Sequence, residues 1–93
     1  MNCSTLEQVR ENIDRIDNEI IKLIAERSTY VALASAFKKN EKGVKDPNRV
    51  EEVIKKVRMK AEIYGANPDM VEVLYREMIR RFIEMEMKEF YKQ

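Results

Sequence analysis

The hydrophobic positions in the first part of the chain repeat with the spacing of one long amphipathic helix. The segment opens at STLE, where Ser4 can cap free main-chain amides and Glu7 completes a capping box. Neither Gly nor Pro occurs before Gly43, and the apolar residues recur in steps of three and four, the seam spacing of packed helices. We therefore predict a helix of about 35 residues, roughly 50 Å long. The seam residues are Leu6, Val9, Ile13, Ile16, Ile20, Leu23, Tyr30, Ala34 and Phe37.

Two further helices are expected, each with a proline at its start. After a polar loop at KNEKGVKD, Asp46 can cap a helix that has Pro47 in its first position and ends at Gly65. The run Asn67-Pro68-Asp69 then starts a third helix that continues to the end of the chain. The apolar positions of the second helix are Val50, Val53, Ile54, Val57 and Ala61. The third helix has two adjoining stripes, which are Val71, Leu74, Met78, Phe82 and Met85, and Tyr75, Ile79, Phe82, Glu86 and Phe90.

These patterns predict an all-α fold of three helices in a single domain, residues 1–93. A compact chain of this length has a diameter of roughly 30 Å. A first helix of roughly 50 Å would extend beyond such a body, so its apolar seam needs cover from elsewhere. A second copy of the chain is the simplest cover. We expect an intertwined homodimer with two-fold symmetry.

Composition and charge restrict the classes of function. Charged residues make up 38% of the chain, but the net charge is only +1, so no global field attracts nucleic acid or an acidic membrane. The absence of histidine excludes histidine metal sites and histidine-dependent catalysis. No apolar run approaches the roughly 20 residues that span a membrane, and the N-terminal residues lack a secretory signal pattern. We expect a cytoplasmic protein that binds neither nucleic acid nor membrane.

One position of the first apolar seam is a charge, Arg27, which lies between Leu23 and Tyr30. An unpaired buried guanidinium is costly, and arginine cannot lose its proton, so Arg27 needs an anionic partner. That partner is either a carboxylate in a structural ion pair or an anionic ligand. Lys38 follows 11 residues later, close to three helical turns, which would place it on nearly the same face and ~16 Å away. The two side chains could reach a small polyanion between them, although a solvated surface role for Lys38 is the alternative.

Three other charged residues raise related questions. Glu86 lies on an apolar stripe of the third helix, where burial would favour its neutral form. It could pair with Arg27 or donate a proton in a site. Arg49, on the first turn of the second helix, is compatible with either a surface or a ligand role. Arg10 precedes Arg27 by 17 residues, ~25 Å along one helix, so both can serve one small ligand only if Arg10 comes from the second copy.

The chain resembles the all-helical chorismate mutase family over nearly its whole length. The resemblance rests on VRENIDRIDNEIIKLIAERSTYVALASAFK, on KDPNRVEEV and on the final helix. The shared motifs are an arginine in the first helix, LIAER, a lysine farther on, and a helix that starts with D-x-x-R. The resemblance implies an intertwined dimer with two cation-lined active sites. It also implies a dicarboxylate enol-pyruvyl ether as substrate, and no metal or cofactor.

The same resemblance implies roles for individual residues. Arg27 and Arg10 would bind the two carboxylates of the substrate, with Arg10 crossing from the partner. Lys38 would donate to the ether oxygen, and Glu86 occupies a position that is Gln in many members and Glu in some. A protonated Glu86 could donate to the same oxygen, which predicts activity favouring acidic pH. The remaining substrate-binding residues implied are Asp46, Arg49, Val50 and Phe82.

In this family two activities share the fold, and some residues of this chain favour one activity while others favour the second. A chorismate mutase is an isomerase that converts chorismate to prephenate in a concerted [3,3] shift, within aromatic amino acid biosynthesis by the shikimate pathway. An isochorismate pyruvate lyase releases pyruvate and salicylate. Many mutases carry Glu directly after the arginine of the second helix, whereas Val50 stands here and, with YVALASAFK, resembles the lyase branch. Glu86, in place of the lyase's usual Gln, favours the mutase. Our first hypothesis is the mutase; the alternatives are the lyase and a non-catalytic dimerisation module in which Arg27 pairs with Glu86.

Overall fold

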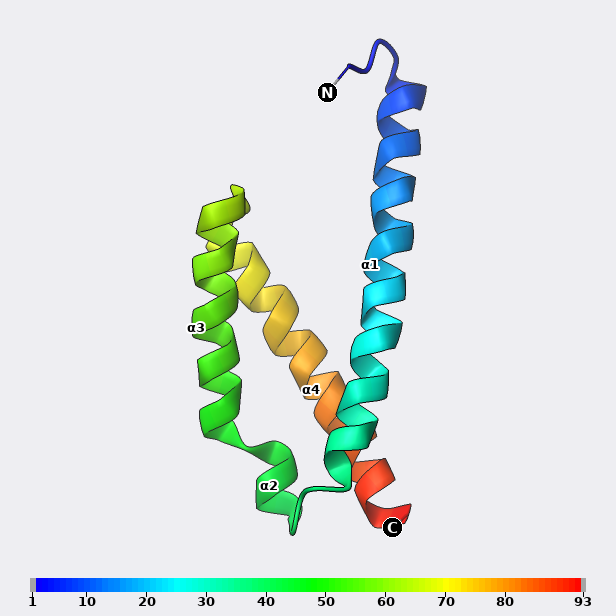
Figure 1. Cartoon of the computed structure of the whole chain (residues 1–93). Coiled ribbons are helices and arrows are strands. Elements are labelled where there is room, and N and C mark those ends of the chain that lie inside the picture. The colour runs from blue at the N-terminus through cyan, green and yellow to red at the C-terminus, as the bar shows by residue number, and fades with distance from the viewer. Residues whose placement is uncertain (1, 93) are drawn as a thin grey trace. The chain divides into compact units, whose positions relative to one another are not determined.

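The computed structural model describes residues 2–92, which form α-helices and no strand. Helix α1 spans Leu6–Ser35, α2 Glu41–Lys45, α3 Pro47–Tyr64 and α4 Pro68–Lys92 (Figure 1). The described chain divides into two compact units, the first ending at Tyr30 and the second beginning at Val31. No helix within residues 2–92 has both the length and the apolar character that a membrane crossing requires. The prediction of an all-α fold is confirmed.

Helix α1 begins one residue later than the sequence pattern indicated. Thr5 acts as the cap, because its Oγ1 accepts a hydrogen bond from the main-chain N–H of Gln8 at 3.1 Å. Gln8 in turn reaches back, and its Oε1 accepts from the main-chain N–H of Ser4 at 2.6 Å. The predicted capping box of Ser4 and Glu7 is therefore wrong. The Thr5 and Gln8 pair has the same spacing one position farther on, but the Gln8 side chain returns to the N–H of Ser4, the residue before the cap.

Helix α1 also ends two residues before the predicted Phe37. The main-chain amides of the three residues after Ser35 bond to carbonyls three residues earlier, at 3.0 to 3.3 Å, which forms a tight turn instead of another α-helical turn. The Ser35 hydroxyl donates to a carbonyl of the preceding turn at 2.6 Å, a local bond of the kind that competes with helix continuation. Lys38 thus lies beyond the helix. The prediction that it shares a helical face with Arg27 is wrong.

The apolar seam of α1 is exposed within the first unit. Leu6 and Leu23 are each 62% exposed, Ile13 is 51% exposed and Ile20 is 48% exposed. A single helix has no second surface against which to bury such a stripe. With 30 residues, α1 is about 45 Å long at ~1.5 Å per residue. The seam predicted from the sequence is present, and among the described residues of its own unit it stays largely exposed.

The segment predicted as a polar loop contains the one-turn helix α2. Asn40 caps it, because Oδ1 of Asn40 accepts from the main-chain N–H of Gly43 at 3.0 Å. Val44 is only 3% exposed and anchors the turn in the core of the second unit, where α2 packs against α4. A helix of five residues is too short to leave a periodic hydrophobic signal. The prediction of a loop here is therefore corrected to a short capped helix.

Asp46 joins α2 to α3 and caps both. Its main-chain N–H donates to Lys42 O at 2.8 Å, which ends α2, and its Oδ1 accepts from the main-chain N–H of Arg49 at 3.1 Å, which caps α3. These two bonds require a left-handed conformation at Asp46, with φ 30°, which aspartate adopts more readily than most residues. Pro47 opens α3 and Gly65, with φ 78°, closes it. The predicted bounds of this helix are confirmed.

Helices α3 and α4 run in opposite directions and pack against each other (Figure 1). The most buried apolar side chains of the second unit are Val44, Ile54, Ala61, Ile79 and Phe82. Of the two stripes predicted on the last helix, the one with Ile79, Phe82 and Glu86 faces this core. The other stripe is partly exposed, with Leu74 at 59% and Met85 at 48%. The buried residues described in the second unit therefore include an ionisable side chain, Glu86.

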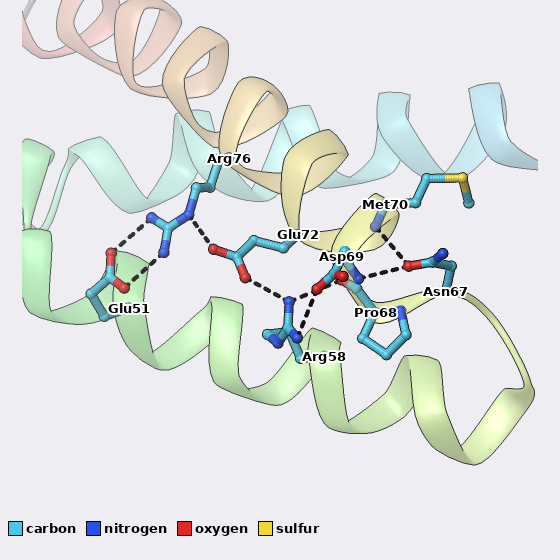
Figure 2. A network of polar contacts seen from close by, with 8 residues as sticks. All are labelled: Glu51, Arg58, Asn67, Pro68, Asp69, Met70, Glu72 and Arg76. Carbon is cyan, nitrogen blue, oxygen red and sulfur yellow. Dashed lines mark hydrogen bonds and ion pairs between the residues drawn. The ribbon is translucent and has the colours of Figure 1, made fainter.

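A chain of ion pairs joins α3 to α4 (Figure 2). The guanidinium of Arg76 binds both carboxylate oxygens of Glu51, at 2.8 and 2.9 Å, and its Nε binds Glu72 at 2.7 Å. Glu72 also accepts from Arg58 at 2.7 Å, and Arg58 reaches Asp69 at 3.0 Å. The Arg76–Glu51 contact is bidentate, the geometry in which arginine holds a carboxylate most firmly. These contacts connect the start of α4 and the middle of α3.

The ion pairs make this connection dependent on pH. Hydrogen bonding to Arg76 holds the pKa of Glu51 below its usual value of 4.5, and the same arginine, followed by Arg58, lowers the pKa of Glu72. A carboxyl whose pKa is lowered by folding stabilises the fold above its unfolded pKa. That contribution is lost as the pH falls through the lower, folded value. The network is therefore at full strength at neutral pH and weakens below about pH 4.5.

Replacing Arg76 by alanine is expected to lower the melting temperature by a few degrees at pH 7. The difference from wild type should shrink as the pH falls below about 4.5, because protonated Glu51 and Glu72 no longer bind the guanidinium as ions. Thermal denaturation at fixed protein concentration, from pH 7 to pH 3, measures this. The matched control is Arg80→Ala, whose pairs with Glu77 and Glu84 lie within α4. An equal loss in the control, or a difference independent of pH, would contradict a bridging role.

Candidate active site

The structure brings together two of the predicted site residues, Lys38 and Glu86. The Nζ atom of Lys38 lies 3.4 Å from Oε2 of Glu86. Lys38 follows the end of α1 inside the second unit, and Glu86 lies on α4. The lysine side chain is 26% exposed and the glutamate side chain 8%. The pair therefore lies at the edge of the core, with the carboxyl group on the buried side and the ammonium group nearer to solvent.

Glu86 has one carboxyl oxygen that lacks a hydrogen bond. The residue is 6% exposed and lies one helical turn after Phe82, which is 5% exposed. Its Oε2 accepts no hydrogen bond from the described residues, although the Lys38 ammonium is close enough for charge attraction. Burial favours the neutral form of a carboxyl group and a neighbouring cation favours the charged form. The predicted burial of Glu86 is confirmed, and its partner in this structure is Lys38.

The ammonium group of Lys38 is also bound to the main chain of α2. Nζ donates to Gly43 O at 2.9 Å. An ammonium group has three N–H donors and no acceptor, so this bond leaves two donors for Glu86 and for a ligand oxygen. Sequence reasoning missed Gly43 because a main-chain carbonyl has no side-chain signature. The available signal was Asn40, a favoured cap residue placed three positions before that glycine.

Three further predicted site residues lie at the start of α3. The Asp46 carboxylate is engaged in capping the helix through the Arg49 N–H. The Arg49 side chain is exposed, and its guanidinium forms an ion pair with Glu52 on the same helix. Val50, the next residue, is half-buried. The structure gives Asp46 a capping role and Arg49 a surface ion pair, and their closing of a substrate site stays a prediction.

The two arginines predicted to bind carboxylates both belong to α1 in the first unit. Arg10 is exposed and Arg27 is half-buried. Both fall within the bounds Leu6–Ser35, so their separation of 17 positions corresponds to ~25 Å along a continuous helix. One copy of the chain therefore cannot direct both guanidinium groups to a single small ligand. The prediction that one chain cannot supply both arginines to one ligand requires only that α1 is a continuous helix, and the structure has such a helix.

The Lys38 and Glu86 arrangement is suited to an oxygen that gains negative charge. The ammonium donors are held at one side by Gly43 O, and the carboxyl group faces them from the core. A fixed cation stabilises developing negative charge more strongly at a partly dry site than in water, and needs no reorganisation when the charge appears. A protonated Glu86 would add a second donor. The arrangement resembles a binding site for an oxyanion more closely than a nucleophile with its base.

A family model described as chorismate mutase type II matches residues 9–87. The chain belongs to the chorismate mutase type II family. The matched residues include Arg10 and Arg27 on α1, Lys38 in the turn after it, the start of α3, and Glu86 on α4. Membership makes the chain an enzyme of the chorismate mutase fold and confirms the resemblance drawn from its motifs.

Two known proteins are similar to this chain, and their names give different activities. An isochorismate pyruvate lyase of Pseudomonas aeruginosa is 35% identical over 86 residues, which cover 92% of this chain and 85% of the lyase. A bifunctional chorismate mutase/prephenate dehydratase of Aquifex aeolicus is 32% identical over 87 residues, covering 89% of this chain and 24% of that protein. The chain thus spans about a quarter of the bifunctional relative but most of the lyase.

Proposed function

We propose that the protein is a chorismate mutase that rearranges chorismate to prephenate. The observation that carries the proposal is the buried Glu86 carboxyl beside the Lys38 ammonium, whose position is fixed by Gly43 O. In the [3,3] shift the carbon–oxygen bond of the enol-pyruvyl ether breaks while a carbon–carbon bond forms. Negative charge builds on the ether oxygen as the first bond breaks. Lys38 supplies hydrogen-bond donors for that oxygen, and Glu86 supplies one more when it is protonated.

The proposed mechanism requires positioning and electrostatics but no covalent catalysis. The substrate must be held in its reactive diaxial conformer, which brings the two carbon atoms that bond within reach. Arg27 binds one substrate carboxylate and Arg10 of a second copy binds the other, because arginine matches the geometry of a carboxylate. Lys38 acts as a point charge on the single ether oxygen. Glu86 donates a hydrogen bond to the same oxygen when it is protonated.

We propose that the active form is a homodimer in which each site uses both chains. Two observations support this. The seam of α1 is exposed, with residues such as Leu6 and Leu23 at 62%, and a second copy of the same seam would cover it. The ~25 Å between Arg10 and Arg27 along α1 also requires two chains if both bind one small dicarboxylate.

The second candidate is an isochorismate pyruvate lyase on the same fold. Val50 favours it, because an apolar side chain stands where many mutases place a Glu that meets the substrate hydroxyl. The similarity to the lyase of Pseudomonas aeruginosa favours it as well. Both reactions are pericyclic and both place negative charge on the same ether oxygen, so the proposed roles of Arg27 and Lys38 apply to either. Glu86 in place of the lyase's usual Gln favours the mutase.

The test is to incubate the purified protein separately with chorismate and with isochorismate. A mutase consumes chorismate, forms prephenate and releases no pyruvate. A lyase consumes isochorismate and releases one pyruvate for each salicylate formed. Loss of each substrate and release of pyruvate are measured together, against the rate without protein. Turnover of neither substrate would contradict both candidates and would favour a non-catalytic helical module.

Replacing Glu86 by glutamine is expected to flatten the pH profile of kcat/KM. An ionised Glu86 cannot donate, so wild-type activity should be greater at acidic than at alkaline pH. The amide of the variant donates at every pH. Steady-state rates from pH 5 to pH 9 measure the difference. Glu84→Gln is the matched control, because Glu84 is an exposed carboxyl on the same helix. A variant profile with the same acid preference as wild type would exclude Glu86 as the titrating donor.

A further inference from the structure

The position of the Lys38 ammonium depends on a single main-chain carbonyl. Lys38 lies past the end of α1, so no helix fixes the direction of its side chain. Its Nζ donates to Gly43 O at 2.9 Å and lies 3.4 Å from Glu86 Oε2. Only the first of these contacts has hydrogen-bond geometry, because the Glu86 oxygen accepts no hydrogen bond from the described residues. The carbonyl of Gly43 is therefore the contact that orients the ammonium.

Asn40 in turn holds both of the peptide groups that flank Gly43. The N–H of Gly43 donates to Oδ1 of Asn40 at 3.0 Å and to its main-chain oxygen at 3.1 Å. The N–H of Val44, which shares a peptide group with the Gly43 carbonyl, donates to that same main-chain oxygen at 3.3 Å, and the Val44 side chain is buried. A helix of one turn has too few internal hydrogen bonds to be stable alone. The Asn40 cap and the Val44 anchor therefore decide whether α2 keeps its shape and where its carbonyls lie.

We propose that Asn40 is a positioning residue for Lys38, acting through the Gly43 carbonyl. The proposal rests on the proposed function in one respect, which is that Lys38 is the donor to the substrate oxygen. With the Gly43 peptide fixed, one ammonium hydrogen is committed to its carbonyl and the other two are directed away from it. Without the cap, α2 loosens and the lysine samples other rotamers, so fewer molecules hold the donor where the ether oxygen lies.

The chain offers a matched control for this cap. Asn67 caps α4 in the same way, and its Oδ1 accepts from the main-chain N–H groups of Asp69 at 2.9 Å and Met70 at 3.2 Å (Figure 2). It lies at the far end of α3, whose 18 residues correspond to roughly 27 Å. Asn67→Ala thus removes an equivalent cap far from Lys38. Asn40→Ser is the conservative variant, because serine is an equally favoured cap residue.

The first readout needs no substrate. Limiting acetic anhydride acetylates amines, and mass spectrometry gives the rate at Lys38 relative to the adjacent Lys39, which is exposed. The expected result is a ratio that rises severalfold in Asn40→Ala, because the freed ammonium loses its carbonyl and becomes more accessible. The ratio should stay at the wild-type value in Asn67→Ala and in Asn40→Ser. An unchanged ratio in Asn40→Ala would overturn the proposal.

The second readout is turnover of whichever substrate the wild-type protein consumes. Asn40→Ala should lower kcat by roughly tenfold with little change in KM, because the lost interaction belongs to the transition state. Asn40→Ser should recover most of that loss. A kcat loss no greater than that of Asn67→Ala would overturn the proposal, since it would reduce Asn40 to a cap that only stabilises the fold. If the wild-type protein consumes neither substrate, the proposed function fails and the acetylation ratio alone decides the placement of Lys38.

Discussion

Replacing Lys38 by alanine will lower kcat/KM by roughly 100- to 1,000-fold. The reaction we propose has no covalent intermediate, so stabilisation of the charge on the ether oxygen is a large part of what the protein can contribute. In this structure Lys38 is the cation whose ammonium is held at the edge of the core, between Gly43 O and Glu86. Steady-state kinetics measure the loss. The neighbouring Lys39→Ala is the matched control and should be close to wild type, because that side chain is exposed.

Loss of Lys38 also leaves the buried Glu86 carboxylate without its ion-pair partner, which is destabilising in itself. The double variant Lys38→Ala with Glu86→Gln separates the two effects. It removes the unpaired charge, so its melting temperature should recover toward the wild-type value. Its activity should not recover, because the cation is still absent. Recovery of activity together with stability would mean that Lys38 serves the fold and not the reaction.

Replacing Arg27 by alanine will lower kcat/KM by at least about 100-fold while leaving a folded protein, if the guanidinium binds a substrate carboxylate. Arg27 lies half-buried on α1 among the seam residues. Circular dichroism and the melting temperature report the fold, and steady-state kinetics report activity. An Arg27→Ala protein that unfolds would favour a structural ion pair over ligand binding. Arg10→Ala should lose activity to a similar extent, because Arg10 is proposed to bind the second carboxylate.

Mixing these two inactive variants tests whether each site uses two chains. In a heterodimer one site combines an intact Arg27 with an intact Arg10, and the other site lacks both. Random reassociation of equal amounts makes half of the dimers heterodimers, so activity should return to about a quarter of the wild-type value. Refolding the two chains together from denaturant, with each variant refolded alone as the control, measures this. Absence of any recovery would argue against sites shared between two copies.

The sequence predicted α3 well because its signals are local. An aspartate before Pro47 and a glycine after Tyr64 define a start and an end that need no tertiary information. The burial of Glu86 could also be predicted, since its position on the stripe with Ile79 and Phe82 follows from helical periodicity alone. These features depend on neighbours within one helix, which the sequence displays directly.

The features that the sequence could not predict depend on where α1 ends and on the short helix α2. Extending α1 through Phe37 placed Lys38 on the wrong helical face, because no Gly or Pro marks the end at Ser35. The short helix α2 leaves no periodic signal, and its contribution to the candidate site is a main-chain carbonyl of Gly43. The contact between Lys38 and Glu86 depends on the end of α1 at Ser35 and on the short helix α2. Sequence reasoning therefore identified the two residues but gave Lys38 the wrong local structure.

We propose that fixed cations of this chain accelerate a pericyclic reaction without help from a metal or a cofactor. The most direct measurement is kcat/KM of the purified wild-type protein for chorismate and for isochorismate, in buffer containing EDTA, compared with the reaction without protein. We expect saturable turnover of at least one of the two substrates, unchanged by EDTA. A rate equal to the uncatalysed rate for both substrates, or turnover that requires an added metal ion, would contradict the proposal.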